Sequence, residues 1–394
     1  MNPYFCYIFS FAIALLTYSL GWSSIYPKIT FSLQLFLLST FLITGAAGYF
    51  WKRESATWKI FPLKEDRNIG RVTIFIYSLW LLDFLYEGGI PFFRIVFNQP
   101  YDYRLFGVPS LHVFTVTFSS FYTLYLFHLY IIQQKKYLLF LYLVNLFAAV
   151  LIYNRGMLFF NLAGSFLLLF FCKNRFRVRL IILSALVIPL MLYLFGLFGT
   201  FRVSRESESV YNNALFMETG QATAEFKQSP IPKEFFWSYI YITSPLANFQ
   251  QNINLTVTDT LGLRKIGQLV TNEFMFDFIS KRSNRILDLK PEIEGRIPGP
   301  FNVSTIYSRS FRLLRWYGIV AMVLLILFLP WVYARAVNTQ SSFFLPGMAI
   351  LCTMYLFMAY DNTIRFTGLS FQLVYPILFS WLKRKQLFSL SKEP

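Results

Sequence analysis

The sequence predicts an all-α polytopic integral membrane protein with about ten membrane-spanning helices and one large loop on the outer side. Two observations carry this prediction. The chain has 394 residues, of which 56% are apolar and only 14% are charged, whereas about a quarter of the residues of a soluble domain are charged. In addition, ten apolar segments approach the roughly 20 residues that a helix needs to cross a bilayer core of about 30 Å.

Seven of the apolar segments precede the large loop and three follow it. They run near 4–21, 30–51, 72–86, 111–132, 137–153, 157–172, 180–198, 317–334, 342–360 and 369–382. The first segment has no basic residue ahead of it and no clear cleavage site, so we expect a retained anchor and not a signal peptide. Prolines inside several segments are expected to kink helices, which neighbouring helices can accommodate.

Basic residues in the short loops predict the orientation of the chain. With a cytoplasmic N-terminus, 17 basic residues lie inside, against five in the short outer loops, and both termini are cytoplasmic. The net charge of +17 would suggest a nucleic-acid partner in a soluble protein. Because these basic residues lie mostly between apolar runs, we interpret them as topology determinants and anion contacts, and we expect no nucleic-acid partner.

The large outer loop covers residues 199–316 of a single membrane domain, 1–394. Inside the loop, 235–249 is apolar but short and broken by Pro245, so it is expected to be a re-entrant or interfacial helix. Further along, helical spacing predicts an amphipathic helix that lies on the membrane surface or caps the bundle. The apolar positions of that helix are Leu263, Ile266, Val270, Phe274 and Phe278.

Arginines at the outer ends of the helices are the candidate substrate-binding residues. A guanidinium group binds phosphate in a bidentate manner and never loses its charge, so an arginine-lined outer cavity would suit a pyrophosphate. The candidates are Arg155, Arg202, Arg205, Arg309 and Arg365. The alternative for each of them is a side chain that reaches to a lipid headgroup.

Candidates for a catalytic acid or base on the same face are Asp361, Glu87 and His112. A hydroxyl group that must lose its proton needs one such group within hydrogen-bonding distance. The alternative for Asp361 is a local ion pair with Arg365, and the alternative for His112 is a helix-end histidine with a satisfied partner. Asp83 could equally form an ion pair with an arginine.

Several chemistries lack their sequence motifs. The chain contains no P-loop and no GxGxxG, HExxH, GxSxG or DxD motif, so neither ATP coupling nor a metal held by carboxylates is expected. Cys6, Cys172 and Cys352 lie in apolar segments without paired spacing, which predicts neither a disulfide framework nor a zinc site. We expect no cofactor.

Five short motifs resemble those of bacterial O-antigen polymerases, the Wzy-type oligosaccharide repeat-unit polymerases. They are EGGIPFF at 87–93, NRG at 154–156, FRVSR at 201–205, YIYITSPLANFQ at 239–250 and PGPFNVSTIYSRSF at 298–311. The predicted architecture is similar as well, with about ten to twelve spans, cytoplasmic termini and a large periplasmic loop. The resemblance implies a bundle of the GT-C-like type that O-antigen polymerases and ligases share.

The resemblance also implies an activity. Such a polymerase moves a growing glycan from undecaprenyl pyrophosphate to the non-reducing end of a lipid-linked repeat unit, at the periplasmic face of the bacterial inner membrane. Arg155, Arg202 and Arg205 match the positions of arginines implicated in that family, with Arg309 and Arg365 less directly matched. The implied partners are the undecaprenyl-pyrophosphate-linked oligosaccharide, membrane lipid and, as a candidate, a regulator of polysaccharide chain length.

Two other functions stay open. An O-antigen ligase uses the same kind of donor, but the resemblance implies a functional histidine in its large loop, and 199–316 contains none. A flippase or other transporter of lipid-linked oligosaccharide would be expected to have internal repeats and charges in the middle of its spans. Here the charges gather at the outer edge, which favours the polymerase.

Overall fold

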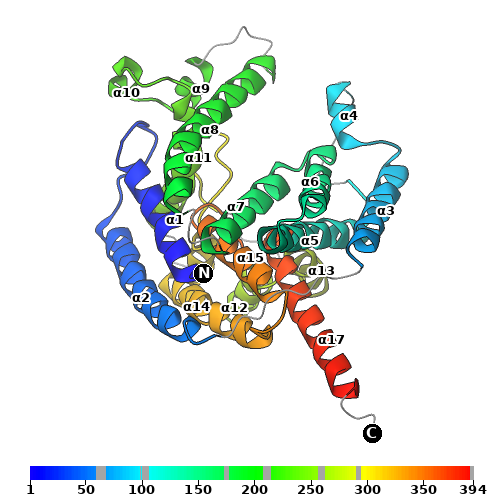
Figure 1. Cartoon of the computed structure of the whole chain (residues 1–394). Coiled ribbons are helices and arrows are strands. Elements are labelled where there is room, and N and C mark those ends of the chain that lie inside the picture. Colours follow the sequence, from blue (N-terminus) through cyan, green and yellow to red (C-terminus); the bar gives the residue numbers. More distant parts are fainter. Residues whose placement is uncertain are drawn as a thin grey trace.

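The chain folds into a bundle of helices, which Figure 1 shows as a computed structural model. The structure describes residues 1–58, 68–97, 99, 106–172, 177–206, 214–255, 262–289 and 294–390. Within these ranges all longer elements are helical, and the only β-type pairing is an isolated antiparallel bridge between Ser23 and Ala222. The predicted all-α class is therefore confirmed.

The helices of the N-terminal half supply most of the long apolar segments. They are α1 (Pro3–Tyr18), α2 (Phe31–Ser55), α3 (Ile69–Glu87), α4 (Pro91–Val96), α5 (Leu111–Gln133), α6 (Lys136–Leu151), α7 (Arg155–Cys172) and α8 (Arg177–Glu206). Glycine or αL residues end several of them. At the end of α3, for example, Gly88 adopts a positive φ of 67° and its N–H bonds back to the helix, as is common at helix C-termini.

The C-terminal half contains shorter helices followed by the last apolar segments. These elements are α9 (Ala214–Thr219), α10 (Ala224–Gln228), α11 (Phe235–Asn254), α12 (Leu263–Leu269), the π-helix η2 (Val270–Phe274), α13 (Asp277–Ile286), α14 (Ser308–Ala336), α15 (Phe344–Phe357), α16 (Thr367–Ser370), the 3₁₀ turn η3 (Phe371–Leu373) and α17 (Val374–Leu390).

Each of the ten predicted apolar segments coincides with a helix, and in the part of the chain that the structure describes five of these helices are long and apolar enough to cross a membrane. These five are α2, α3, α5, α7 and α14. In the other five segments, the apolar helical stretches within the described residues are 10–17 residues long, compared with the roughly 20 residues of a full span. One of them is part of the longer helix α8. The structure is therefore compatible with a membrane protein, while the count of ten spans stays a prediction.

The segment 199–316 is largely helical. The apolar stretch 235–249 forms α11, which packs against α1 and α8 and buries most of its length. Its start contacts α8 so closely that a Cβ on Gly199 would lie 2.7 Å from the Trp237 ring. The α11 helix is not among the candidate spans, which agrees with the expectation that this stretch does not cross the membrane.

Aromatic residues fill the centre of the bundle around α1. Tyr7 of α1 and Tyr307, just before α14, share a hydrogen bond of 2.7 Å between their hydroxyl groups. Tyr4 donates a hydrogen bond to the carbonyl oxygen of Leu327 inside α14. These contacts satisfy buried hydroxyls, which would otherwise destabilise an apolar interior, and they attach the N-terminal helix to α14 and to the residue directly before it.

A sharp kink divides α14 into a short first part and a long apolar part. Leu314 and Arg315 have non-helical dihedral angles, and Arg315 has a positive φ of 56°. After the kink, Gly318 lies so close to the first part that a Cβ would meet the Ser310 carbonyl oxygen at 2.0 Å. The kink therefore separates the first turns, which carry Arg309, from the apolar segment.

Candidate functional site

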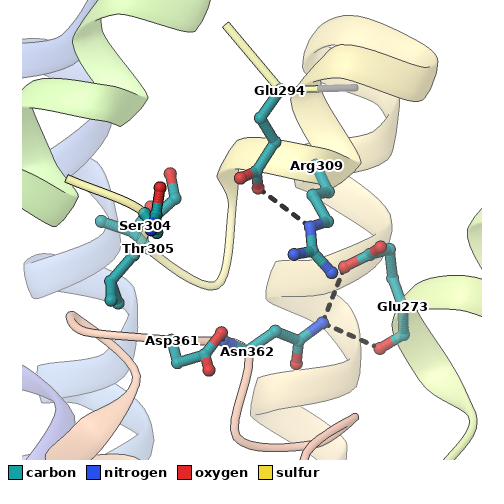
Figure 2. A pocket seen from close by; sticks show the side chains of 9 residues that line it. Glu273, Glu294, Ser304, Thr305, Arg309, Asp361 and Asn362 are labelled. Atoms are coloured by element: carbon teal, nitrogen blue, oxygen red, sulfur yellow. Dashed lines mark hydrogen bonds and ion pairs between the residues drawn. The ribbon is translucent and has the colours of Figure 1, made fainter. Parts of the chain in front are cut away.

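A small polar cavity lies at one end of the bundle, where α15 ends and α14 begins. Its volume is about 90 Å³, and a water molecule needs roughly 10–15 Å³ of such space. The cavity therefore has room for several waters or for one small polar group of a ligand. Figure 2 shows that its walls come from η2, the strand-like loop before α14, the first turn of α14 and the turn after α15. The lining residues are Glu273, Glu294, Asn302, Val303, Ser304, Thr305, Arg309, Asp361 and Asn362.

Glu273 is held at the cavity by a change of helical geometry. The helix that begins as α12 continues as the π-helix η2, and such π segments occur frequently at functional sites. Glu273 is only 2% exposed. The Asn362 side-chain amide donates to its carboxylate Oε2 at 2.9 Å and to its backbone carbonyl at 3.0 Å. One amide group thus fixes both the backbone and the side chain of Glu273.

Arg309 projects from the first turn of α14 toward two carboxylates (Figure 2). Its Nε donates to Glu294 Oε1 at 3.0 Å, and the Glu294 side chain is only 4% exposed. Arg296 lies 3.8 Å from the other Glu294 oxygen. Because a hydrogen bond between two charged groups is stronger than a neutral one, Arg309 is firmly engaged with Glu294.

The turn after α15 places Asp361 and Asn362 in the cavity wall. Asp361 Oδ1 accepts the backbone N–H of Asn362 at 2.7 Å. Asn362 Oδ1 in turn accepts the N–H groups of Ile364 and Arg365 at 3.2 and 3.3 Å. Asn and Asp side chains commonly close turns in this way. The turn leaves the Asn362 Nδ2 group free to reach Glu273.

Enclosure by protein raises the pKa of both cavity acids that lack an arginine partner. Burial raises the pKa of Glu273 to about 8, although Arg309 and the hydrogen bond from Asn362 act in the opposite direction. Asp361 lines the cavity and is also exposed, yet desolvation by the surrounding protein raises its pKa to about 6 against the effects of the Asn362 N–H and Arg309. At pH 7, Glu273 is therefore mostly protonated and Asp361 mostly ionised.

This arrangement places a base and an acid in the same cavity. An ionised Asp361 can accept a proton, and a protonated Glu273 can donate one; environments that separate two carboxyl pKa values in this way are typical of acid–base sites. Since Arg309 is paired with Glu294, the cavity carries a net negative charge. A hydroxyl group therefore fits it better than an anion does. Among the described residues, no group of His, Cys, Asp or Glu is arranged to hold a metal ion.

Two asparagines of α11 position the loop that carries Glu294 and lines the cavity. Asn248 donates to the carbonyl groups of Phe301 and Val303 at 2.9 and 2.7 Å. Asn252 binds both the N–H and the carbonyl of Gly295, at 2.9 and 2.8 Å. Both asparagines are fully buried, so these bonds also satisfy their own polar groups. The α11 helix thus holds the cavity wall in place.

The structure brings together two of the predicted site residues, Asp361 and Arg309, and separates a third from them. Arg365 does not pair with Asp361, which was the alternative considered from the sequence. Its Nε instead lies 2.6 Å from Asp277 Oδ1 at the start of α13. The reason is that the Asn362 turn reverses the chain and directs Arg365 away from the cavity. Glu273, Glu294 and Asn362 complete the site and were not predicted.

Arg155 lies at the same end of the bundle. It begins α7 and is exposed, and its guanidinium carbon lies 5.4 Å from the centre of the Tyr153 ring. Further along α7, Phe160 packs edge to face against Phe357 and Phe366, which flank the turn that carries Asp361. The exposed guanidinium is thus available to an anion near the cavity. Arg202 and Arg205 lie in the last turns of α8, but their side chains are outside the described part of the structure.

Glu87 and His112 do not line the cavity but form a second polar group around the loop before α5. His112 Nδ1 lies 2.9 Å from Asp83 Oδ2, and Asp83 is completely buried. The other Asp83 oxygen accepts the Val108 N–H at 3.0 Å, and Glu87 accepts the Gly107 N–H at 2.9 Å. Asp83 therefore pairs with a histidine and not with an arginine. Both carboxylates therefore hold the loop that leads into α5.

Replacing Gly107 by alanine is expected to destabilise this loop by about 1–3 kcal/mol. Gly107 has a φ of +91°, and a Cβ would lie 2.6 Å from the His112 ring. Thermal unfolding in detergent should show a lower midpoint for Gly107→Ala. The control is Gly267→Ala, because a Cβ on Gly267 meets nothing within 4 Å. Equal midpoints for the two variants would contradict the prediction.

With this geometry in view, the chain was compared with known proteins. No protein-family model, no curated protein and no solved structure matches it.

Proposed function

We propose that this chain is a polymerase of O-antigen or a related surface polysaccharide. It transfers the growing glycan from undecaprenyl pyrophosphate to the non-reducing end of a lipid-linked repeat unit. The observation that carries the proposal is the cavity, where Asp361 can act as a base beside a protonated Glu273. Long apolar helices beneath the cavity support a substrate that is itself anchored in a membrane.

In the proposed reaction the acceptor hydroxyl occupies the cavity. Its oxygen forms a bond to the anomeric carbon of the donor glycan while the bond from that carbon to the pyrophosphate oxygen breaks. The hydroxyl proton passes to the Asp361 carboxylate, and undecaprenyl pyrophosphate leaves with the electron pair. A base at hydrogen-bonding distance typically contributes about 10²–10⁴-fold to such a step.

The departing pyrophosphate needs positive charge outside this acidic cavity. Arg309 is engaged by Glu294 and Arg365 by Asp277, so their main effect is on the neighbouring carboxylates. Exposed Arg155 is the described residue best suited to the leaving group, and the sequence adds Arg202 and Arg205. Fixed cations near a charge that grows in the transition state lower the barrier, often as the largest single contribution.

The proposal includes a location and an orientation. The chain lies in the bacterial inner membrane with both termini in the cytoplasm, and the cavity end of the bundle faces the periplasm. This orientation is supported by the basic residues of the short loops. A C-terminal reporter that is active only in the periplasm should therefore stay inactive, and its activity would contradict the orientation.

Deletion of the gene followed by gel analysis of surface polysaccharide tests the function itself. A polymerase predicts lipopolysaccharide capped with a single repeat unit, and the ladder should return when the intact chain is supplied again. Loss of all O-antigen on lipid A-core, with lipid-linked polymer retained, would instead identify a ligase. An unchanged ladder would refute both activities.

Arg155→Ala is expected to leave the single-unit band without a ladder at normal expression, because the leaving pyrophosphate loses the exposed cation that we assign to it. Removal of one such donor typically lowers the rate by about 10²–10³-fold. The matched control is Arg335→Ala. Arg335 is an exposed arginine in the last turn of α14, whereas the cavity lies at the first turn of that helix. A full ladder from Arg155→Ala would remove Arg155 from the site.

A further inference from the structure

The segment from α12 to α13 forms a helical hairpin with two different ends. Its closed end carries Glu273 and packs through Phe276 and Phe278 against Phe371, at ring distances of 5.3 Å. At its open end, the Arg264 guanidinium donates to the Asp288 carbonyl at 2.7 Å and so joins the start of α12 to the end of α13. The cavity and the open end are thus at opposite ends of one rigid element.

The open end exposes aliphatic side chains. Leu263 and Ile286 are 88% and 82% exposed, and Ile266 and Leu287 are 49% and 57% exposed. Large aliphatic residues exposed together on one small surface usually mark a contact with a membrane or another molecule. The helix predicted from the sequence at Leu263–Phe278 therefore divides into a buried half at the bundle and an exposed half.

The same end carries more positive than negative charge. Among the described residues of this end, Arg264, Lys265 and Arg285 lie within it, against the one acid Asp288. The described residues of this end include no aromatic side chain, whereas protein interfaces depend strongly on Trp and Tyr. Aliphatic residues flanked by lysine and arginine are instead typical of segments that lie in the headgroup region of an anionic bilayer.

The position of the hairpin in the fold is consistent with a location at the membrane surface. Leu269 of α12 packs against Leu313 and Leu314 at the kink of α14, together with Ala321 of its apolar part. On the other side, Arg282 of α13 donates to the Ser110 hydroxyl at 2.7 Å, directly before α5 begins. The hairpin therefore lies where two candidate spans, α5 and α14, begin (Figure 1).

We propose that the open end of this hairpin inserts into the headgroup region of an anionic phospholipid bilayer. Leu263, Ile266, Ile286 and Leu287 enter the boundary of the acyl chains, and Arg264 and Arg285 contact lipid phosphate. An interfacial segment of this kind buries its apolar face by roughly 5–10 Å. The inserted end fixes the hairpin relative to the membrane and so fixes the height of Glu273 above it.

The test uses the full chain in phospholipid vesicles, with Cys6, Cys172 and Cys352 replaced by alanine. A polarity-sensitive fluorophore is attached at Ile286→Cys, and the vesicles contain lipids with a nitroxide near the top of the acyl chain. We expect strong quenching and a blue-shifted emission in vesicles of phosphatidylglycerol. The label at Leu42→Cys, an exposed position in α2, should also be quenched, while the label at exposed Glu225→Cys in α10 should not.

The charge requirement is tested separately. The double substitution Arg264→Glu and Arg285→Glu should weaken the quenching at Ile286→Cys several-fold, and so should vesicles of phosphatidylcholine alone. Quenching that is equal in both lipids would overturn the requirement for lipids with a net negative charge. A label at Ile286→Cys that stays unquenched while Leu42→Cys is quenched would overturn the insertion, and energy transfer between labelled copies in that case would assign the surface to a second chain. None of these outcomes depends on glycan transfer.

Discussion

Asp361→Asn is expected to abolish the polysaccharide ladder and to lower the transfer rate of the purified protein by about 10²–10⁴-fold. The amide keeps the size of the side chain and can still accept the Asn362 N–H through its oxygen, so the turn after α15 should survive. It cannot accept a proton from the acceptor hydroxyl. The rate is measured with a lipid-linked repeat unit as substrate.

The matched control for this substitution is Glu218→Gln, which makes the same change from carboxylate to amide at an exposed position at the end of α9. That variant should retain the ladder. A full ladder from Asp361→Asn, at the same expression level, would exclude Asp361 as the base. Loss of protein from the membrane would indicate misfolding, so expression must be compared for both variants.

The pH profile separates a catalytic role of Asp361 from a structural one. Because its pKa is raised to about 6, the rate should increase with pH through about 6 as the carboxylate ionises. If the reaction also needs the protonated form of Glu273, the rate should fall again as the pH rises through about 8. Glu273→Gln should then remove this decrease at alkaline pH. A rate that stays constant between about pH 5 and pH 7 would contradict the assignment of Asp361 as base.

The helices could be predicted from the sequence because apolar runs of sufficient length leave few alternatives in a membrane. Each of the ten predicted segments contains a helix, and the long segment 199–316 is largely helical. Whether each short apolar helix crosses the membrane depends on its packing and tilt, and the hydropathy of the sequence gives no information about either. The helix α11 illustrates this, since its burial comes from contacts with α1 and α8.

The candidate site could be predicted only in part. Asp361 and Arg309 are polar residues beside apolar segments, and that position alone suggested a function. Glu273 lies 89 residues before its partner Asn362, and no local pattern predicts that contact. The two acids Glu273 and Asp277 among the apolar residues of 269–278 were the available indication. The pairing of Arg365 with Asp277 was missed for the same reason, because it requires the start of α13 to lie beside the turn after α15.

Arg309→Ala is expected to destabilise the protein by about 3 kcal/mol, the lower end of the range for breaking a buried ion pair. The lower end applies because the Arg309 side chain is 30% exposed, whereas Glu294 is 4% exposed and would remain as an uncompensated charge. Thermal unfolding in detergent should show this as a lower midpoint. Arg296→Ala is the matched control, since Arg296 lies 3.8 Å from Glu294, is 41% exposed and should contribute less than about 1 kcal/mol.

The loss caused by Arg309→Ala should increase with pH, because Arg309 lowers the pKa of Glu273 and Asp361. A carboxyl group whose pKa is raised in the folded state favours folding below its unfolded pKa, and this contribution is lost as the pH rises through the folded pKa. For Glu273 that window extends from about 4.5 to about 8 in the intact protein, and without Arg309 it extends further. Combining Arg309→Ala with Glu273→Gln should recover part of the stability at about pH 8 and little at about pH 5. A recovery that is the same at both pH values would show that the folded state does not raise the pKa of Glu273.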